Sequence, residues 1–322
     1  MESGSRPRRK PMPFLTAVPL LLAALSPGAM LPDERASAPE RQGLVPLRCE
    51  FVERLPVVTV AWAVDGKTRE SRFLLDSGAE GSMFFPSADA PAARRTAEGE
   101  AKPRAVRLWS GSGAGRRDLG STEFVTIPEG YVTADMAALV ERLRIVGLIG
   151  ADFFAAHDVL LDYREGMIFA SPPRWKERPV PGFERLPLTP WGAWRTASVV
   201  LNETPFSMAL MIVDTGTSMT VLPTSAAPGG PPPGAEASST VTPFATYYGW
   251  REPRRVTIAP LKRPFDLPVS FVGEVTPVLR PGDLGERVLL RFGQDEAWIR
   301  RDPTPSQGAT GTTSVAGPPG RS

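Results

Sequence analysis

The chain has 322 residues, of which 42% are hydrophobic, so it can supply hydrophobic cores for two domains of ordinary size. Its 37 basic and 35 acidic residues are mixed along the sequence and give a net charge of only +2, so no nucleic-acid partner is expected. A single cysteine, Cys49, and a single histidine, His157, exclude an intramolecular disulfide framework, a cysteine-based metal cluster and a two-histidine metal hydrolase. We therefore expect neither a metal nor a cofactor.

The N-terminus carries a basic stretch at residues 6–10, then a mainly apolar run from Phe14 to Leu25, then small residues. This order is typical of a secretory signal peptide. The apolar run has about a dozen residues, fewer than the roughly 20 that a membrane-spanning helix needs. We expect residues 1–30 to be a signal peptide or an apolar N-terminal segment. The protein would then be exported to the periplasm or the extracellular space, or tethered to a membrane by this segment, with no stable membrane span.

Two stretches of the chain follow the same pattern, residues 57–86 and residues 197–223. Each begins with a β-rich apolar run, turns at a polar pair and returns as a second apolar run that ends in an aspartate, Asp76 or Asp214. Each copy is therefore predicted to be a β-hairpin that leads into a tight Asp-Ser/Thr-Gly turn.

Later landmarks recur in the same order in both copies. The apolar-apolar-glycine segment that ends at Gly150 is matched with Asp283-Leu284-Gly285, in which an aspartate replaces the first apolar residue. Two strands predicted after Gly150 correspond to two at residues 288–292 and 296–299. We infer a tandem duplication, in which Asp283 weakens the support beneath the second turn.

Composition divides the chain further. Residues 171–190 contain six prolines and are predicted to be an extended linker between an N-terminal lobe, residues 44–170, and a C-terminal lobe, residues 191–300. Residues 223–240 are rich in proline, glycine and alanine, so we expect a disordered insertion there, and a disordered tail at residues 301–322.

Helical spacing of apolar residues predicts one helix, residues 134–144. The remainder consists of short strands and turns, so the fold class is mainly β. His157 is expected on the surface or in a loop, and Asp152 and Asp162 are expected to bond nearby backbone rather than to take part in catalysis.

Asp76 and Asp214 carry the candidate chemistry. Each ends an apolar strand, where a carboxylate is costly to bury without partners, and each is followed by a small hydroxyl residue and a glycine. One such tripeptide is a common turn sequence. Two of them at equivalent positions of a repeat favour a functional pair.

These motifs resemble the active sites of aspartic peptidases of the pepsin and retropepsin type. Asp76-Ser77-Gly78-Ala79 is similar to the retropepsin-like active-site turn, and Asp214-Thr215-Gly216-Thr217-Ser218 to that of the second pepsin lobe. Residues 148–153 resemble the apolar segment that packs behind the turn. The resemblance implies a bilobal acid-protease-like fold, with two pseudo-twofold-related, β-barrel-like lobes and the active-site cleft between them.

The same resemblance implies an aspartic endopeptidase, in which a water molecule activated between the catalytic residues Asp76 and Asp214 hydrolyses a peptide bond. One carboxylate acts as general base while the other, protonated, donates to the scissile carbonyl. Active-site turn support is expected from four residues, because the hydroxyls can hydrogen-bond across the axis and the glycines permit a close turn: Ser77, Gly78, Thr215 and Gly216. The partner is a polypeptide substrate, and the chain is expected to be monomeric.

A glycine-rich stretch after the first turn is a candidate flap over the cleft, at Trp109, Gly111 and Gly113. A plain hairpin turn is the alternative. In the second copy, residues 247–250 are at the comparable place, where they would form a second cover, line the cleft or pack as an aromatic cluster.

Three other readings of the chain stay open at this point. The first is a homodimeric retropepsin-like peptidase that uses one lobe per chain. The second is a weakly active or inactive peptide-binding protein with the same fold, and the third is an exported β-rich adhesion module. The sequence assigns neither the cleavage specificity, nor the pH optimum, nor the carboxyl group that holds the shared proton.

Overall fold

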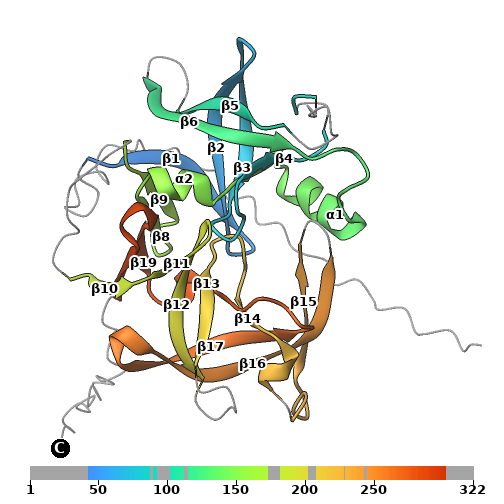
Figure 1. Ribbon diagram of the computed structural model, residues 1–322, viewed down its shortest axis with the longest axis vertical. Coiled ribbons are helices and arrows are strands. Elements are labelled where there is room, and N and C mark those ends of the chain that lie inside the picture. The colour runs from blue at the N-terminus through green and yellow to red at the C-terminus, as the bar shows by residue number, and fades with distance from the viewer. Residues whose placement is uncertain are drawn as a thin grey trace, which may run out of the picture. The chain divides into compact units, whose positions relative to one another are not determined.

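The computed structural model describes residues 43–87, 90–92, 102–111, 115–172, 182–201, 208–227, 229–242 and 245–301 (Figure 1). All of them belong to one compact unit, Ala36–Ser322. The predicted signal segment, residues 1–30, and nearly all of the predicted tail lie outside these ranges. None of the helices within them is long and apolar enough to cross a membrane.

The first lobe is a closed barrel of six strands in the order β2-β3-β7-β4-β6-β5, completed by pairing between β5 and β2. The pairs β3–β7 and β4–β6 are parallel, and the others are antiparallel. The strands are β2 (Leu55–Val64), β3 (Lys67–Leu75), β4 (Ser82–Phe84), β5 (Arg104–Ser110), β6 (Arg117–Thr126) and β7 (Gly147–Ile149).

The second lobe repeats this arrangement in the order β12-β13-β18-β14-β17-β16, and pairing between β12 and β16 closes it. Again two pairs are parallel, β13–β18 and β14–β17. The strands are β12 (Trp194–Leu201), β13 (Ala209–Val213), β14 (Thr220–Leu222), β16 (Thr246–Ile258), β17 (Arg263–Val272) and β18 (Val278–Leu279). Two further strands, β11 (Thr189–Trp191) and β15 (Glu236–Val241), extend its edges.

Six antiparallel strands in the order β10-β20-β19-β8-β9-β1 join the two lobes. The pair at the centre is β8 with β19, one strand from each half of the chain, with Leu160 opposite Leu289. The strands are β1 (Val45–Val52), β8 (Val159–Asp162), β9 (Met167–Ala170), β10 (Glu184–Pro187), β19 (Arg287–Arg291) and β20 (Glu296–Arg300). The predicted match between the strand pairs that end each half is confirmed.

The equivalent strand order of the two barrels confirms the predicted fold class, which is mainly β with two similar, barrel-like lobes. It also supports the tandem duplication, because the parallel pairs recur at the same places in both halves. A one-residue shift in any of these pairings would turn buried side chains outward, so the shared register reflects the repeated apolar pattern.

Aromatic packing fixes the end of β3. Phe84 contacts Phe73 and Trp62 with ring centroids 5.9 and 4.9 Å apart, and all three side chains are fully buried. Burial of each such side chain stabilises the fold by about 1.5–3 kcal/mol. β3 is exposed at its start and buried at Leu75, so the chain reaches Asp76 from inside the core.

The predicted helix is confirmed as α1 (Ala134–Leu143), with the Thr133 hydroxyl accepting from the Met136 amide at the start and Arg144 in the left-handed conformation at the end. A second helix, α2 (Ala151–Ala156), is not predicted because one and a half turns show no clear periodicity. Short 3-10 turns occur at Thr224–Ala226, Ala259–Leu261, Pro281–Asp283 and Phe292–Gln294.

Two segments predicted to lack regular structure contain strands. In the predicted insertion at residues 223–240, Glu236 onward forms β15, because this short polar stretch pairs along its whole length with β16. In the predicted linker, residues 173–181 lie outside the described ranges. Its last part forms β10 and β11, because prolines are tolerated at sheet edges.

His157 lies in the short loop between α2 and β8, as one of the two predicted alternatives had it, but it is buried rather than on the surface. It ends α2, where its ring stacks on Phe153 and its Nδ1 lies 2.8 Å from the Ser171 carbonyl oxygen. Burial lowers the pKa of His157, which favours the neutral ring. Its contacts are structural, so the prediction that it has no part in the site still stands.

Candidate active site

The two predicted active-site turns lie at equivalent points of the two barrels. Asp76 follows β3, and its amide donates to the Ile149 carbonyl of β7 at 2.9 Å. Asp214 follows β13, and its amide donates to the Leu279 carbonyl of β18 at 3.0 Å. Each aspartate is thus fixed by the parallel strand behind it.

This register corrects the predicted support of the second turn. Leu75 pairs with Ile149, and Val213 pairs with Leu279, so Arg280 stands where Gly150 stands in the first lobe. The supporting segment is residues 278–280, not Asp283-Leu284-Gly285 as predicted. Apolar support beneath Asp214 is therefore intact.

Ser77 and Thr215 hold the two turns together with reciprocal hydrogen bonds. The Ser77 amide donates to Thr215 Oγ1 at 2.9 Å, and the Thr215 amide donates to Ser77 Oγ at 3.0 Å. Each hydroxyl in turn donates across the axis, to the carbonyl of Val213 at 2.8 Å or of Leu75 at 2.7 Å. Both side chains are buried, so these four bonds are shielded from water and fix the turns relative to each other.

Gly78 and Gly216 let each turn approach the opposite aspartate. A Cβ atom on Gly78 would lie 2.6 Å from Asp214 Oδ1, and one on Gly216 would lie 2.7 Å from Asp76 Oδ2. Neither separation is sterically allowed. Glycine is therefore needed here for close approach, not for an unusual backbone angle.

A hydrogen bond joins the carboxyl groups of Asp76 and Asp214. Desolvation raises the pKa of both residues, and the charge of Asp76 raises the pKa of Asp214 further. Two carboxylates this close cannot readily ionise together, so they share one proton.

Backbone amides donate to both carboxyl groups of the pair. Asp76 Oδ1 accepts from the amides of Gly78 and Ala79, both at 3.0 Å, and these bonds lower its pKa. The Asp214 pKa is raised well above its ordinary value, although the Gly216 amide donates to Oδ1 at 2.7 Å. The Thr217 hydroxyl donates to the Met219 carbonyl instead of to the dyad. The pKa of each carboxyl group is raised, so the pair holds one shared proton near neutral pH.

Asp152 and Asp283 brace the two turns from behind, and neither belongs to the dyad. Asp152 accepts from the Ser82 hydroxyl at 2.8 Å, and Asp283 accepts from the Thr220 hydroxyl at 2.9 Å. The serine oxygen accepts from the Gly150 amide at 3.0 Å, and the threonine oxygen accepts from the Arg280 amide at 3.2 Å. Asp283 is thus the counterpart of Asp152 and supports the second turn, contrary to the predicted weakness.

The second brace differs from the first because it contains buried charge. Asp283 Oδ1 lies 2.7 Å from Arg54 Nη2 and 3.1 Å from Arg280 Nη1, and the Asp283 and Arg280 side chains are 1% and 5% exposed. The Arg280 guanidinium also lies over the Tyr163 ring, 4.9 Å from its centroid. Arg54 belongs to the turn between β1 and β2, so this network ties the first lobe to the second.

Trp194, at the start of β12, contacts the first active-site turn and was not predicted from the sequence. Its indole Nε1 donates to the Gly78 carbonyl at 2.8 Å. Val57 faces Leu74 and Thr196 faces Ile212, so Trp194 is equivalent to Leu55 of the first lobe, which has no such donor. No sequence signal marks this contact, because it joins residues from different lobes.

The candidate flap is not brought to the dyad by any described contact. Trp109 lies in β5 opposite Ala61, and its ring is covered by the Arg116 guanidinium at 3.8 Å. Gly111 follows β5, and Gly113 lies outside the described residues. Among the described residues, these contacts are those of a barrel hairpin.

The hairpin of β15 and β16 instead reaches from the second turn to the first lobe. In β15, the Ser238 hydroxyl donates to Met219 Sδ at 3.7 Å, beside the second turn. Near the tip, the Thr246 hydroxyl donates to Asp135 Oδ2 of α1 at 2.6 Å. Within predicted residues 247–250, Tyr248 is 71% exposed, whereas Trp250 stacks on Phe271. The predicted second cover, residues 247–250, therefore lies in a hairpin that contacts both lobes.

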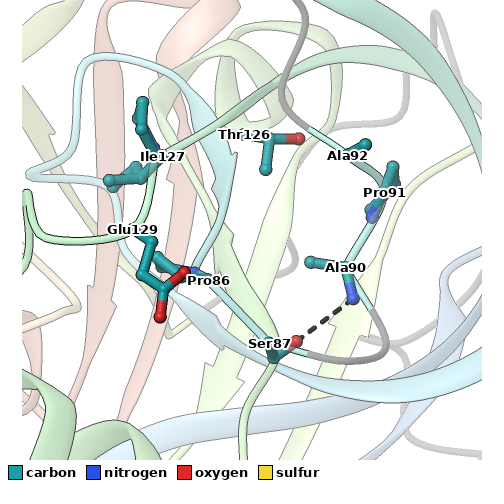
Figure 2. A pocket seen from close by; sticks show the side chains of 9 residues that line it. Pro86, Ser87, Ala90, Pro91, Ala92, Thr126, Ile127 and Glu129 are labelled. Carbon is teal, nitrogen blue, oxygen red and sulfur yellow. Dashed lines mark hydrogen bonds between the residues drawn. The ribbon is translucent and has the colours of Figure 1, made fainter.

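A pocket of about 400 Å³ lies where β4 and β6 end, between Pro86 and the segment 126–129 (Figure 2). The Ala90 amide donates to the Ser87 hydroxyl across its floor at 3.1 Å. Of the described residues that line it, only Glu129 is ionisable, so it is separate from the dyad. Within the described ranges, no group of three or more histidine, cysteine or acidic residues is placed to hold a metal ion.

Two solved structures of seed proteins are similar to this chain. Conglutin gamma, a basic 7S globulin from lupine seeds, is 11% identical with a TM-score of 0.48, over 81% of this chain and 95% of that one. Basic 7S globulin from soybean is 12% identical with a TM-score of 0.48, over 80% and 95%. No protein-family model and no curated protein sequence matches the chain. Similarity at this level carries no inference about function.

The raised pKa values predict that Asp214→Asn increases stability at neutral pH. A carboxyl whose pKa is higher in the folded state destabilises the fold above the unfolded pKa of about 3.9, and this cost vanishes below it. The asparagine variant should therefore resist urea better than wild type at pH 7 and lose that advantage below about pH 4. Asp118→Asn is the control with the opposite sign, because Arg107 lowers the pKa of Asp118. A less stable Asp214→Asn protein at pH 7 would contradict the raised pKa of Asp214.

Proposed function

We propose that the protein is an aspartic endopeptidase that cleaves peptide bonds with the Asp76 and Asp214 pair. The observation that carries this proposal is the hydrogen-bonded pair of carboxyl groups, held by reciprocal bonds between Ser77 and Thr215. A purely structural aspartate would gain nothing from a second carboxyl beside it, because each raises the cost of ionising the other.

The shared proton gives the two carboxyl groups different roles. The ionised carboxyl takes a proton from a water molecule, whose oxygen attacks the scissile carbonyl carbon, while the protonated carboxyl donates its proton to the carbonyl oxygen. In the resulting tetrahedral diol, the second carboxyl recovers a proton from a hydroxyl, and the first passes its proton to the amide nitrogen as the carbon–nitrogen bond breaks. Both residues return to their starting states, and no acyl-enzyme forms.

The dyad is complete within one chain, which favours a single-chain enzyme over a homodimer that uses one lobe per chain. The second candidate is a peptide-binding protein with the same fold and little or no activity. Trp194 favours it, because its indole occupies the Gly78 carbonyl beside the dyad. A substrate backbone would otherwise find an acceptor there.

Asp76→Asn and Asp214→Asn variants test the proposal. Each should lower kcat/KM for peptide cleavage by about a thousandfold or more, since each removes a group that transfers a proton in the reaction. Cleavage of a mixed peptide library, read by mass spectrometry, gives the measurement.

Asp152→Asn is the matched control, because this half-buried aspartate lies behind the first turn and outside the dyad. It should retain most of the activity. Activity that survives either dyad variant, or that is absent from the wild type at every pH, would reject the peptidase and favour the binding protein.

A further inference from the structure

Two tryptophans face each other on the hairpin formed by β11 and β12. Trp191 is paired with Trp194 across the turn at Gly192, and their ring centroids are 5.5 Å apart with the planes tilted by 58°. Trp191 is 50% exposed, and the other residues of β11 are exposed as well. A tryptophan left half in water on a sheet edge contributes little to the core, and such residues are enriched where proteins bind partners.

This aromatic pair is placed next to the dyad. Trp194 donates its indole proton to the Gly78 carbonyl, and Gly78 is close enough to Asp214 that a Cβ atom there would meet its carboxylate. The Trp191 ring lies next to the Trp194 ring, with 5.5 Å between their centroids. An extended peptide advances about 3.3 Å per residue, so a side chain two or three positions from the scissile bond can reach Trp191.

The hairpin that carries the two rings is held firmly. The Thr196 hydroxyl donates to the Thr189 carbonyl at 3.0 Å, across β11 and β12. Next to Trp194, the Arg195 guanidinium donates from Nε to the Phe292 carbonyl at 3.1 Å and lies 2.5 Å from Asp295. A fixed aromatic surface binds a ligand at lower entropic cost than a mobile one.

We propose that Trp191 and Trp194 form an aromatic platform that binds an aromatic or large apolar side chain of the substrate, two or three positions from the scissile bond. The platform belongs to the second lobe alone, because the place equivalent to Trp194 in the first lobe holds Leu55, which is buried. This inference rests on the proposed peptidase function, since it places the substrate at the same dyad.

Paired inhibitor peptides test the platform without requiring turnover. Statine-containing peptides that mimic the tetrahedral intermediate are made with phenylalanine or alanine at each position two or three residues from the statine, and their Kd values are measured by calorimetry. At one of these positions, wild type should bind the phenylalanine peptide at least about tenfold more tightly. Trp191→Ala should reduce this ratio to near one.

Leu210→Ala is the matched control, because Leu210 is also 50% exposed and lies on the neighbouring strand β13. It should keep the wild-type ratio. An unchanged ratio in Trp191→Ala, no preference for phenylalanine at any tested position, or no binding of any peptide would overturn the platform. Failure of the peptidase proposal is distinct, because wild type would then bind the phenylalanine peptides selectively and cleave nothing.

Discussion

Gly216→Ala is expected to lower kcat/KM by about a hundredfold or more, because misplacement of a reacting group by about 1 Å has an effect of that size. The added Cβ atom would lie 2.7 Å from Asp76 Oδ2 and closer still to its Cγ, so the carboxyl group must move. Asp76 is one of the two carboxyl groups that share the proton, and its displacement separates it from Asp214. Gly78→Ala should have the same effect on Asp214 by the symmetric contact.

Gly81→Ala is the matched control for both glycine variants. It lies in the same turn region as Asp76, yet a Cβ atom at this position would have nothing within 4 Å. Steady-state cleavage of one peptide by the three variants gives the comparison. Near-normal activity of Gly216→Ala would show that the turns can separate without loss, and that the close approach of the lobes is not required.

The features that were predictable from the sequence are those that depend on neighbours in the chain. Asp76-Ser77-Gly78 and Asp214-Thr215-Gly216 each follow an apolar run and form a tight turn by local geometry alone. Their repetition at equivalent positions also implied the cross-axis pairing of Ser77 and Thr215. The strands of the two hairpins followed from alternation of buried and exposed residues.

The support behind the second turn was mispredicted because different residues pack at this place in the two lobes. Gly150 cannot carry a side chain, since a Cβ atom there would meet the backbone of Gly81. In the second lobe, Met219 and Arg280 occupy these two positions, and the Arg280 side chain extends to Asp283 instead. The second lobe therefore has no glycine equivalent to Gly150. Gly285, which was matched to it, lies against Ile299 elsewhere in the lobe.

Contacts between the lobes were also beyond prediction. The hydrogen bond from Trp194 to Gly78 spans 116 positions, and that from Thr246 to Asp135 spans 111. No sequence pattern marks either pair, because each residue has the sequence context of an ordinary strand or helix position. Only the closed topology of both barrels brings these residues together.

Asp283→Ala is expected to reduce the free energy of unfolding by about 3–5 kcal/mol, the range for breaking a buried ion pair from one side. The variant leaves the Arg280 guanidinium, only 5% exposed, without its counter-charge. It also removes the acceptor of the Thr220 hydroxyl. Asp283→Asn should recover part of the loss, because the amide oxygen can still accept from Thr220.

Two control variants separate the effect of buried charge from that of hydrogen bonding. Asp152→Ala removes the equivalent brace in the first lobe, where the partners are neutral hydroxyls of Ser82 and Thr122, and should cost about 1–3 kcal/mol. Asp118→Ala breaks the exposed pair with Arg107 and should cost less than about 1 kcal/mol. Urea denaturation of all three variants at one pH, with equal slopes, provides the comparison.

The relative losses in the free energy of unfolding of the three variants show whether Asp283 helps to position the active site. Its carboxylate holds the Thr220 hydroxyl, which accepts the Arg280 amide, and the preceding residue, Leu279, supplies the carbonyl that binds the Asp214 amide. A large loss of stability in Asp283→Ala, with reduced cleavage at temperatures where the protein stays folded, would show that this buried network positions Asp214. If Asp283→Ala costs no more than Asp152→Ala, Arg280 finds other partners, and the position of Asp214 depends on β13 and β18 alone.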